Sequence, residues 1–313
     1  MYYPYFRGKQ FDLIAIRDTA ECMAENDFVP IIEPVRDNLR GLQKTLEKIC
    51  SAGGKAVVVV NPHHGDLAED GGRISQMLGE VFHAYDSITA GIFLDNEITA
   101  DDAMRIYNAH SEHDPVFIHA GFRFGKLLVA ELGADIENSR HIFFEQYCRD
   151  LYRNHFARSN HKVLIRDGFL RQKNADYPEI EKFSELHLTY QTSMGMQGFG
   201  DFLIVGDEFT EGGGPAYAVA IHISFINSHD EDVMYVRHFL SEDRSTPTDP
   251  AGKFSQALAN LINHLNSADS QILETSAIAQ FRELHEDEHF PGLGQVKKLS
   301  MIHHIETLAD YLS

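Results

Sequence analysis

The chain has 313 residues, of which 43% are hydrophobic and 24% are charged. These values are ordinary for a folded protein and exclude long disordered or fibrous segments. With 47 acidic and 27 basic side chains, the net charge is −20, which on average disfavours binding to nucleic acid. No apolar run approaches the roughly 18 residues that a membrane helix requires. The composition therefore predicts a protein that does not span a membrane and has room for one large α/β domain or two small ones.

Neither the amino terminus nor the cysteines indicate export. Residues 1–10 place aromatic residues and Pro4 where a secretory signal would carry a basic and then an apolar segment. Cys22, Cys50 and Cys148 are odd in number and lack C-x-x-C spacing, which argues against a disulfide framework or a thiolate zinc site. We therefore expect a cytoplasmic protein.

Eight short apolar runs alternate with segments of helical period in the first two thirds of the chain. The runs are mostly continuous, as in strands that are covered on both faces of a parallel sheet. The expected strands are 11–16, 29–35, 56–60, 90–94, 116–119, 141–144, 162–165 and 202–205.

The segments between these runs predict helices. The clearest is 37–51, where Leu39, Leu42, Leu46 and Ile49 recur at spacings of three and four. Another is expected to start at Thr99, which stands three residues before an aspartate as in a capping box. Weaker helical stretches are expected at 73–85, 124–132 and 147–158.

Eight strands with intervening helices in about 200 residues predict a (β/α)₈ TIM-like barrel, whose usual size is roughly 250 residues. An open doubly wound sheet is the main alternative, but no G-x-G-x-x-G follows the first strand. We expect a single TIM-like barrel domain over 1–313, with a β-hairpin insertion at 207–250 and C-terminal helices at 251–313. The hairpin strands are expected at 216–225 and 233–240. The aromatic residues of segment 2–6 are expected to plug one barrel end.

Several motifs carry a resemblance to a known family. They are Tyr3-Pro4-Tyr5-Phe6-Arg7-Gly8-Lys9-Gln10-Phe11, Gly200-Asp201-Phe202, Gly212-Gly213-Gly214-Pro215-Ala216-Tyr217, Arg237-His238-Phe239-Leu240-Ser241 and Phe290-Pro291-Gly292-Leu293-Gly294. From residue 2 to about 304, the chain resembles the beta-protein-like families of bacteria and phages. The resemblance implies a phage or mobile-element setting and a barrel-like fold, and it assigns no catalytic residue.

In a TIM barrel the residues that follow the carboxyl ends of the strands share one face, where the active sites of this fold lie. This rule gives the candidate catalytic residues Glu33, Asp95, His119, Glu145, Arg166 and Asp167. It also gives Asn61 and His63 as candidate binding residues, and the end of the hairpin adds Arg237 and His238. Carboxylates and imidazoles hold divalent metals or act as acids and bases, while arginine neutralises an anion. The structural alternative is that polar residues end strands and cap helices.

A second motif is His285-Glu286-Asp287-Glu288-His289, which matches the zincin pattern H-E-x-x-H. It predicts a zinc protease if both imidazoles lie one turn apart on a helix. Two acidic residues inside the motif and Pro291 just after it argue instead for an exposed helix end.

These observations leave both an enzyme and a binding protein open. The leading hypothesis is a hydrolase acting on a small anionic ligand, a phosphate ester or nucleotide, at the strand ends. A divalent metal ion is a candidate cofactor, His119 a candidate proton relay and Arg166 a candidate anion clamp. The alternative is a non-catalytic binding or regulatory component of a phage-linked defence or mobile-element system, with a protein partner docked on the hairpin.

Overall fold

Eight short parallel strands form a ring in the computed structural model, which describes residues 1–212, 214, 217–243 and 245–313. Gly213, Pro215 and Ala216 of the glycine-rich motif therefore lie outside the described residues. The described chain divides into two units. The first comprises Met1–Asp167 and Leu186–Phe202, and the second comprises Gly168–Glu185 and Leu203–Ser313.

The first unit is a (β/α)₈ barrel, as predicted. Its strands, in order around the ring, are β1 (Tyr5–Phe6), β2 (Ile31–Ile32), β3 (Ala56–Val59), β4 (Ile88–Leu94), β5 (Val116–His119), β6 (Arg140–Phe144), β7 (His161–Ile165) and β9 (Gly198–Gly200). The main-chain N–H groups of Tyr3 and Tyr5 donate to the carbonyls of Phe199 and Asp201 at 2.8 and 2.9 Å, which joins the last strand to the first.

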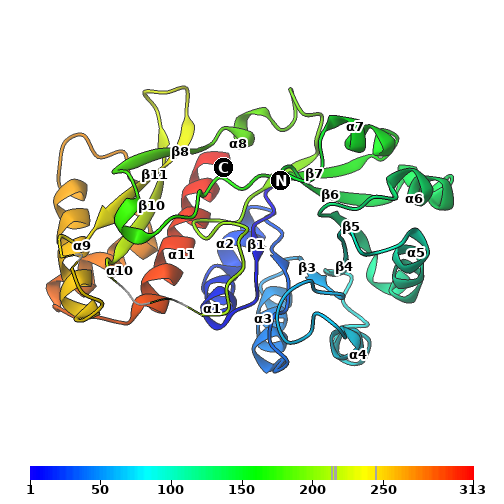
Figure 1. Ribbon diagram of the computed structural model, residues 1–313, viewed down its shortest axis with the longest axis horizontal. Coiled ribbons are helices and arrows are strands. Elements are labelled where there is room, and N and C mark those ends of the chain that lie inside the picture. Colours follow the sequence, from blue (N-terminus) through cyan, green and yellow to red (C-terminus); the bar gives the residue numbers. More distant parts are fainter. Residues whose placement is uncertain (213, 215–216, 244) are drawn as a thin grey trace. The chain divides into compact units, whose positions relative to one another are not determined.

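Helices occupy the outside of this ring (Figure 1). They are α1 (Gln10–Asp18), α2 (Ala20–Glu25), α3 (Arg40–Ser51), α4 (Gly72–Val81), α5 (Ala100–Ala109), α6 (Gly125–Leu132), α7 (Asp150–Arg153) and α8 (Leu186–Thr189). The N-terminal cap predicted at Thr99 is confirmed for α5, because the Thr99 side chain accepts a hydrogen bond from the N–H of Asp102. The described residues contain no helix long and apolar enough to cross a membrane.

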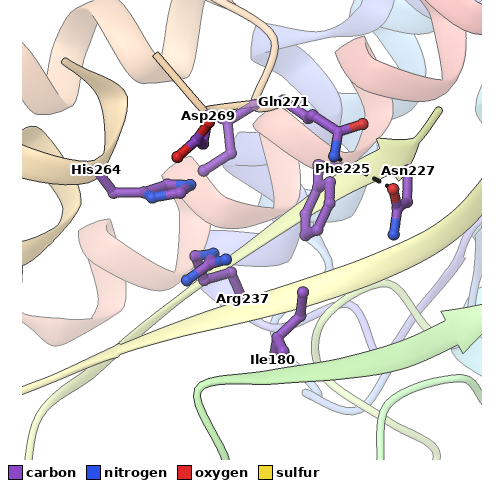
Figure 2. Close-up of a pocket in the computed structure, with 8 residues that line it drawn as sticks. Ile180, Phe225, Asn227, Arg237, His264, Asp269 and Gln271 are labelled. Atoms are coloured by element: carbon purple, nitrogen blue, oxygen red, sulfur yellow. Dashed lines mark hydrogen bonds between the residues drawn. The ribbon is translucent and has the colours of Figure 1, made fainter. Parts of the chain in front are cut away.

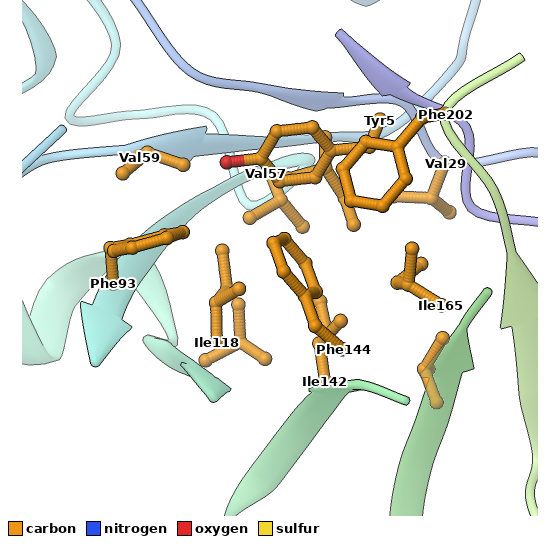
Figure 3. Close-up of a cluster of buried hydrophobic side chains, with 13 residues drawn as sticks. Tyr5, Val29, Val57, Val59, Phe93, Ile118, Ile142, Phe144, Ile165 and Phe202 are labelled. Carbon is orange, nitrogen blue, oxygen red and sulfur yellow. The ribbon is translucent and has the colours of Figure 1, made fainter. Parts of the chain in front are cut away.

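The interior of the ring is filled by alternate side chains of the strands, as the two-residue period of a strand requires (Figure 3). Ile118, Ile142 and Ile165 point inward, while aromatic rings fill the carboxyl end. There, Tyr5 lies edge-on to Phe144 with 5.2 Å between ring centroids. The barrel is therefore a packed core and not an open channel.

Two of the eight predicted strands were wrong. Segment 11–16 forms helix α1, which buries Leu13 and Ile16 on one side. The aromatic segment before it supplies β1, so Tyr5 belongs to the barrel wall, and its ring packs at one barrel end against Phe144 and Phe202. The last strand is Gly198–Gly200 and not 202–205. It runs so close to the first strand that a Cβ on Gly200 would lie 2.0 Å from the Tyr3 carbonyl oxygen. Only glycine allows the closing strand to approach the first so closely.

The second unit contains a three-stranded antiparallel sheet in the order β10-β11-β8. The predicted hairpin is present as β10 (Ala220–Asn227) and β11 (Val233–Leu240), and β8 (Ile180–Ser184) is a third strand beside β11. Helices α9 (Pro250–Leu265), α10 (Ser276–Glu286) and α11 (Leu293–Leu312) complete the unit. Helix α11 lies beside β10, and the Nε2 atom of His303 contacts the Ser224 carbonyl oxygen at 2.8 Å.

Candidate active site

A buried carboxylate organises the carboxyl end of the barrel, which we call the mouth. Glu33 follows β2 and has no solvent exposure. Its Oε1 atom accepts hydrogen bonds from the N–H groups of His63 and His64, at 2.9 and 3.0 Å, and from the His64 ring. Its Oε2 atom accepts from the hydroxyl of Tyr5 at 2.9 Å and forms an ion pair with Arg7. Glu33 therefore holds the loop after β3 against the first strand.

The charge of Glu33 is stabilised by these partners. Burial by itself would raise its pKa, but the hydrogen bond from His64 and the charge of Arg7 outweigh burial and hold the pKa at about 2. The guanidinium of Arg7 lies over the rings of Tyr5 and Phe202, 5.1 and 5.6 Å from their centroids. Fully bonded and out of reach of solvent, Glu33 is a positioning residue.

His63 and Asp95 form another, more exposed pair at the mouth. The Nδ1 atom of His63 lies 2.8 Å from Oδ2 of Asp95, while the other oxygen of Asp95 accepts the N–H groups of Glu97 and Ile98. The His63 ring stacks on Phe93 with 5.6 Å between centroids, and its side chain is 45% exposed. A carboxylate on Nδ1 keeps the lone pair on Nε2, which is the arrangement of a general base with its orienting acid.

The loop that carries His63 is fixed at both ends. The side-chain amide of Asn61 uses its oxygen and its nitrogen on the main chain of Phe93, both at 2.8 Å. Gly65 has a φ of +80°, and a Cβ there would lie 2.1 Å from the Val35 carbonyl oxygen. The Asn61 amide thus bonds to the backbone through both its oxygen and its nitrogen, and the loop is constrained on either side of His63.

Glu145 and Arg166 form the second charged pair of the mouth. Arg166 donates through Nε and Nη2 to the two oxygens of Glu145, at 2.5 and 2.9 Å, in a bidentate pair. Both side chains are about one quarter exposed. Asp167 follows at the same end and is half-buried. Because the strands are parallel, the structure brings Glu33, Asp95, Glu145, Arg166, Asp167 and His63 to one end of the barrel.

His119 lies elsewhere, because Ile118 beside it points inward and His119 therefore points outward beneath the helices. It is fully buried, with Nε2 2.9 Å from Nδ1 of His141 and Nδ1 2.7 Å from the Tyr152 hydroxyl. This chain of hydrogen bonds ends at Ser139, whose Oγ lies 2.8 Å from Nε2 of His141 and donates to the Ile136 carbonyl. Burial lowers the pKa of His141 to about 3 and that of His119 well below its usual value.

Arg237 and His238 belong to the second unit, and neither is a residue of the barrel. They point to opposite faces of β11, as strand geometry requires. His238 is 2.7 Å from His222 between their Nδ1 atoms and 3.1 Å from Glu181 through Nε2. Burial lowers its pKa to about 4. Arg237 forms an ion pair with Glu179 and lines a small pocket (Figure 2).

The zincin motif does not have the required helical placement. Helix α10 ends at Glu286, so His285 lies on it and His289 lies beyond it, and both are exposed. Within the parts of the chain that the structure describes, no three His, Cys, Asp or Glu side chains are grouped so that they could hold a metal ion.

Arg7 and Tyr5 are mouth residues that the sequence did not assign. Arg7 follows β1 as Glu33 follows β2, so the strand-end rule would have found it had residues 5–6 been assigned as a strand. No protein-family model, curated protein or solved structure matches this chain.

Proposed function

We propose that the barrel is a hydrolase that acts on a small phosphate ester or nucleotide at its mouth by general acid–base catalysis. The observation that carries the proposal is the 2.8 Å contact of His63 with Asp95, in which one imidazole nitrogen is held and the ring is exposed. The geometry supports His63 as the proton-transferring group in place of His119.

The proposed roles follow from the contacts. His63 takes a proton from water at Nε2, the water oxygen attacks phosphorus, and the ester P–O bond breaks. The proton is then returned to the leaving oxygen. Asp95 orients the imidazole and stabilises its charged form. The partly exposed Arg166 binds the phosphate oxygens, which compete with Glu145 for its guanidinium.

The proposal is tested by the release of product from p-nitrophenyl phosphate, bis(p-nitrophenyl) phosphate and nucleoside mono- and triphosphates. We expect His63→Ala to lower kcat by about 10²- to 10⁴-fold, the usual contribution of a positioned acid–base group. Asp95→Asn is expected to lower kcat less, because the amide still contacts the imidazole but no longer fixes the tautomer in which Nε2 accepts a proton.

His161→Ala is the matched control. His161 is an exposed histidine at the start of β7, at the opposite end of the barrel, so its loss should leave kcat unchanged. No hydrolysis of any of these esters, or equal activity in His63→Ala and wild type, would contradict the proposal.

The alternative, a phage-linked binding component with a protein partner on the hairpin, would be favoured by an exposed apolar patch there. Among residues 217–240, the only large apolar side chain that is exposed is that of Tyr217. The hairpin therefore presents no continuous apolar patch in its described part. The acid–base pair of the mouth favours the enzyme.

A further inference from the structure

Four large apolar side chains are exposed where helices α6 and α7 begin. Phe124 and Leu127, at the start of α6, are 37% and 56% exposed, and Tyr147 and Leu151, at the start of α7, are 53% and 79% exposed. Because both helices follow barrel strands, both starts lie at the mouth end of the ring. Single exposed apolar side chains are common on proteins, but a group of them marks an interaction surface.

The two helix starts are in contact with each other. Gly125, the first residue of α6, packs against the rings of Tyr152 and Phe156, which lie in and just after α7. The Cys148 thiol, just before α7, donates to the carbonyl of His119 at the end of β5, at 3.1 Å. The two helices are also neighbours on the outside of the ring in Figure 1. The four apolar side chains therefore belong to one stretch of surface, which we call the α6/α7 rim.

The α6/α7 rim carries positive charge, although the whole chain has a net charge of −20. Arg123, Lys126 and Arg149 are exposed among the apolar side chains, and none of them forms an ion pair with a residue that the structure describes. The acid beside them, Asp150, is already paired with Arg153. Screening limits the reach of an exposed charge to about 8 Å at physiological ionic strength, so remote acids add little at this surface.

The shape and chemistry of the α6/α7 rim favour a lipid surface as its partner. Leu127, Tyr147 and Leu151 are each more than half exposed, so they protrude from the surface and do not line a hollow. A rigid partner would need a matching hollow, whereas a fluid lipid surface adapts to protruding side chains. Nucleic acid would match the cations but offers no apolar phase for two leucines. Apolar side chains flanked by Arg and Lys are typical of proteins that bind at the headgroups of an anionic bilayer.

We propose that the α6/α7 rim docks on the anionic surface of a lipid bilayer. Leu127 and Leu151 insert at the boundary between the headgroups and the acyl chains, and Tyr147 lies at the level of the headgroups. The three cations pair with the anionic groups of the lipids. Docking of this kind requires no spanning helix, and it does not depend on the proposed hydrolase activity.

Flotation of the full chain with lipid vesicles tests the docking. We expect the chain to bind vesicles of phosphatidylcholine that contain one third phosphatidylserine. Binding to vesicles of phosphatidylcholine alone should be weaker by on the order of 100-fold, because each of the three cations contributes about fivefold near an anionic surface. Added salt should weaken binding to the anionic vesicles, since it screens the cations.

Insertion of the leucines is tested by fluorescence. The chain contains no tryptophan, so Leu151→Trp provides a single fluorophore at the α6/α7 rim. Its emission should shift to the blue on phosphatidylserine vesicles and should be quenched by lipids with brominated acyl chains, because the indole leaves water. Tyr85→Trp is the matched control. Tyr85 is 46% exposed and lies before β4, at the opposite end of the barrel, so the emission of this variant should not change.

Substitutions at exposed positions, where folding is not at stake, assign the contacts. The double variant Leu127→Ser with Leu151→Ser should bind phosphatidylserine vesicles at least tenfold more weakly, because two apolar side chains no longer leave water. Lys126→Gln should weaken the same binding about fivefold. Val81→Ser and Lys55→Gln are the matched controls at the opposite end of the barrel and should leave binding unchanged.

Three results would overturn the inference. Failure of the wild-type chain to bind phosphatidylserine vesicles would exclude a lipid surface and leave an acidic protein surface as the partner. Equal binding to vesicles with and without phosphatidylserine would remove the role of the cations. Unchanged emission of Leu151→Trp in the presence of bound vesicles would show that the α6/α7 rim does not face the bilayer.

Discussion

The barrel holds two histidine groups that differ in where their hydrogen-bond chains end. Beneath the helices, every nitrogen of His119 and His141 is committed, and the chain ends at hydroxyls and a main-chain carbonyl. At the mouth, His63 uses one nitrogen on a carboxylate and exposes nearly half of its side chain. A closed, buried chain cannot gain a proton without breaking a bond, whereas the open pair can. A closed chain fits a structural role, whereas the open pair fits the acid–base role that we propose for His63.

The Ser139 hydroxyl determines which atoms donate and which accept along the buried chain of hydrogen bonds through His141, His119 and Tyr152. The Ser139 hydroxyl donates to a carbonyl, so its oxygen accepts the Nε2 proton of His141. Nδ1 of His141 then accepts from His119, and Nδ1 of His119 accepts from Tyr152. Both imidazoles are neutral in this arrangement, in agreement with their lowered pKa values.

The largest effect on stability is expected at the base of the mouth. Glu33→Ala should lower the free energy of unfolding by about 3–5 kcal/mol, because it leaves the charge of buried Arg7 without its carboxylate. Urea unfolding followed by circular dichroism measures this. Glu21→Ala, which breaks an exposed pair with Lys48, is the control and should leave the midpoint unchanged. An unchanged midpoint in Glu33→Ala would show that the carboxylate does not hold the loop.

A smaller effect is expected in the outer layer. His119→Phe keeps an aromatic ring but leaves His141 and Tyr152 without their shared partner, so we expect a loss of about 3 kcal/mol. His63→Ala at the mouth should change stability by less than about 0.5 kcal/mol, as exposed substitutions usually do. If the two variants were equally stable, the distinction between the closed chain and the open pair would fail.

The last prediction concerns the pH dependence of stability. The native chain keeps His119 and His141 neutral, while the unfolded chain protonates them below about 6.5. The unfolded state therefore binds more protons, and stability falls as the pH drops below 6.5, by up to about 1.4 kcal/mol per pH unit for each group. Glu33 adds a loss only below about pH 4.5, towards its native pKa of about 2. Urea midpoints measured between pH 8 and 5 test this, and a flat profile would contradict it.

Most of the barrel could be predicted, because continuous apolar runs such as 56–60 and 116–119 have no competing interpretation. Segment 11–16 could not be placed, since its five apolar residues, interrupted by Asp12, fit either a helix or a strand. The closing strand was missed because its two glycines carry no strand signal, although the close approach at Gly200 requires them.

The mouth was predicted in part. Counting from the strand ends located Glu33, Asp95 and His63. It could not show that Glu33 is buried and accepts five hydrogen bonds. The position of His119 was available from strand alternation, because it directly follows the inward-facing Ile118.

The course of the chain between the two units constrains how the barrel is made. The chain leaves the ring after Asp167, returns for Leu186–Phe202 and leaves again. The ring is sealed by contacts such as that of Tyr2 with Asp201, at 2.7 Å, between residues 199 positions apart. During synthesis β1 therefore stays unpaired on one side until β9 has left the ribosome. Contacts of such long range form slowly. No single proteolytic cut separates the two units intact.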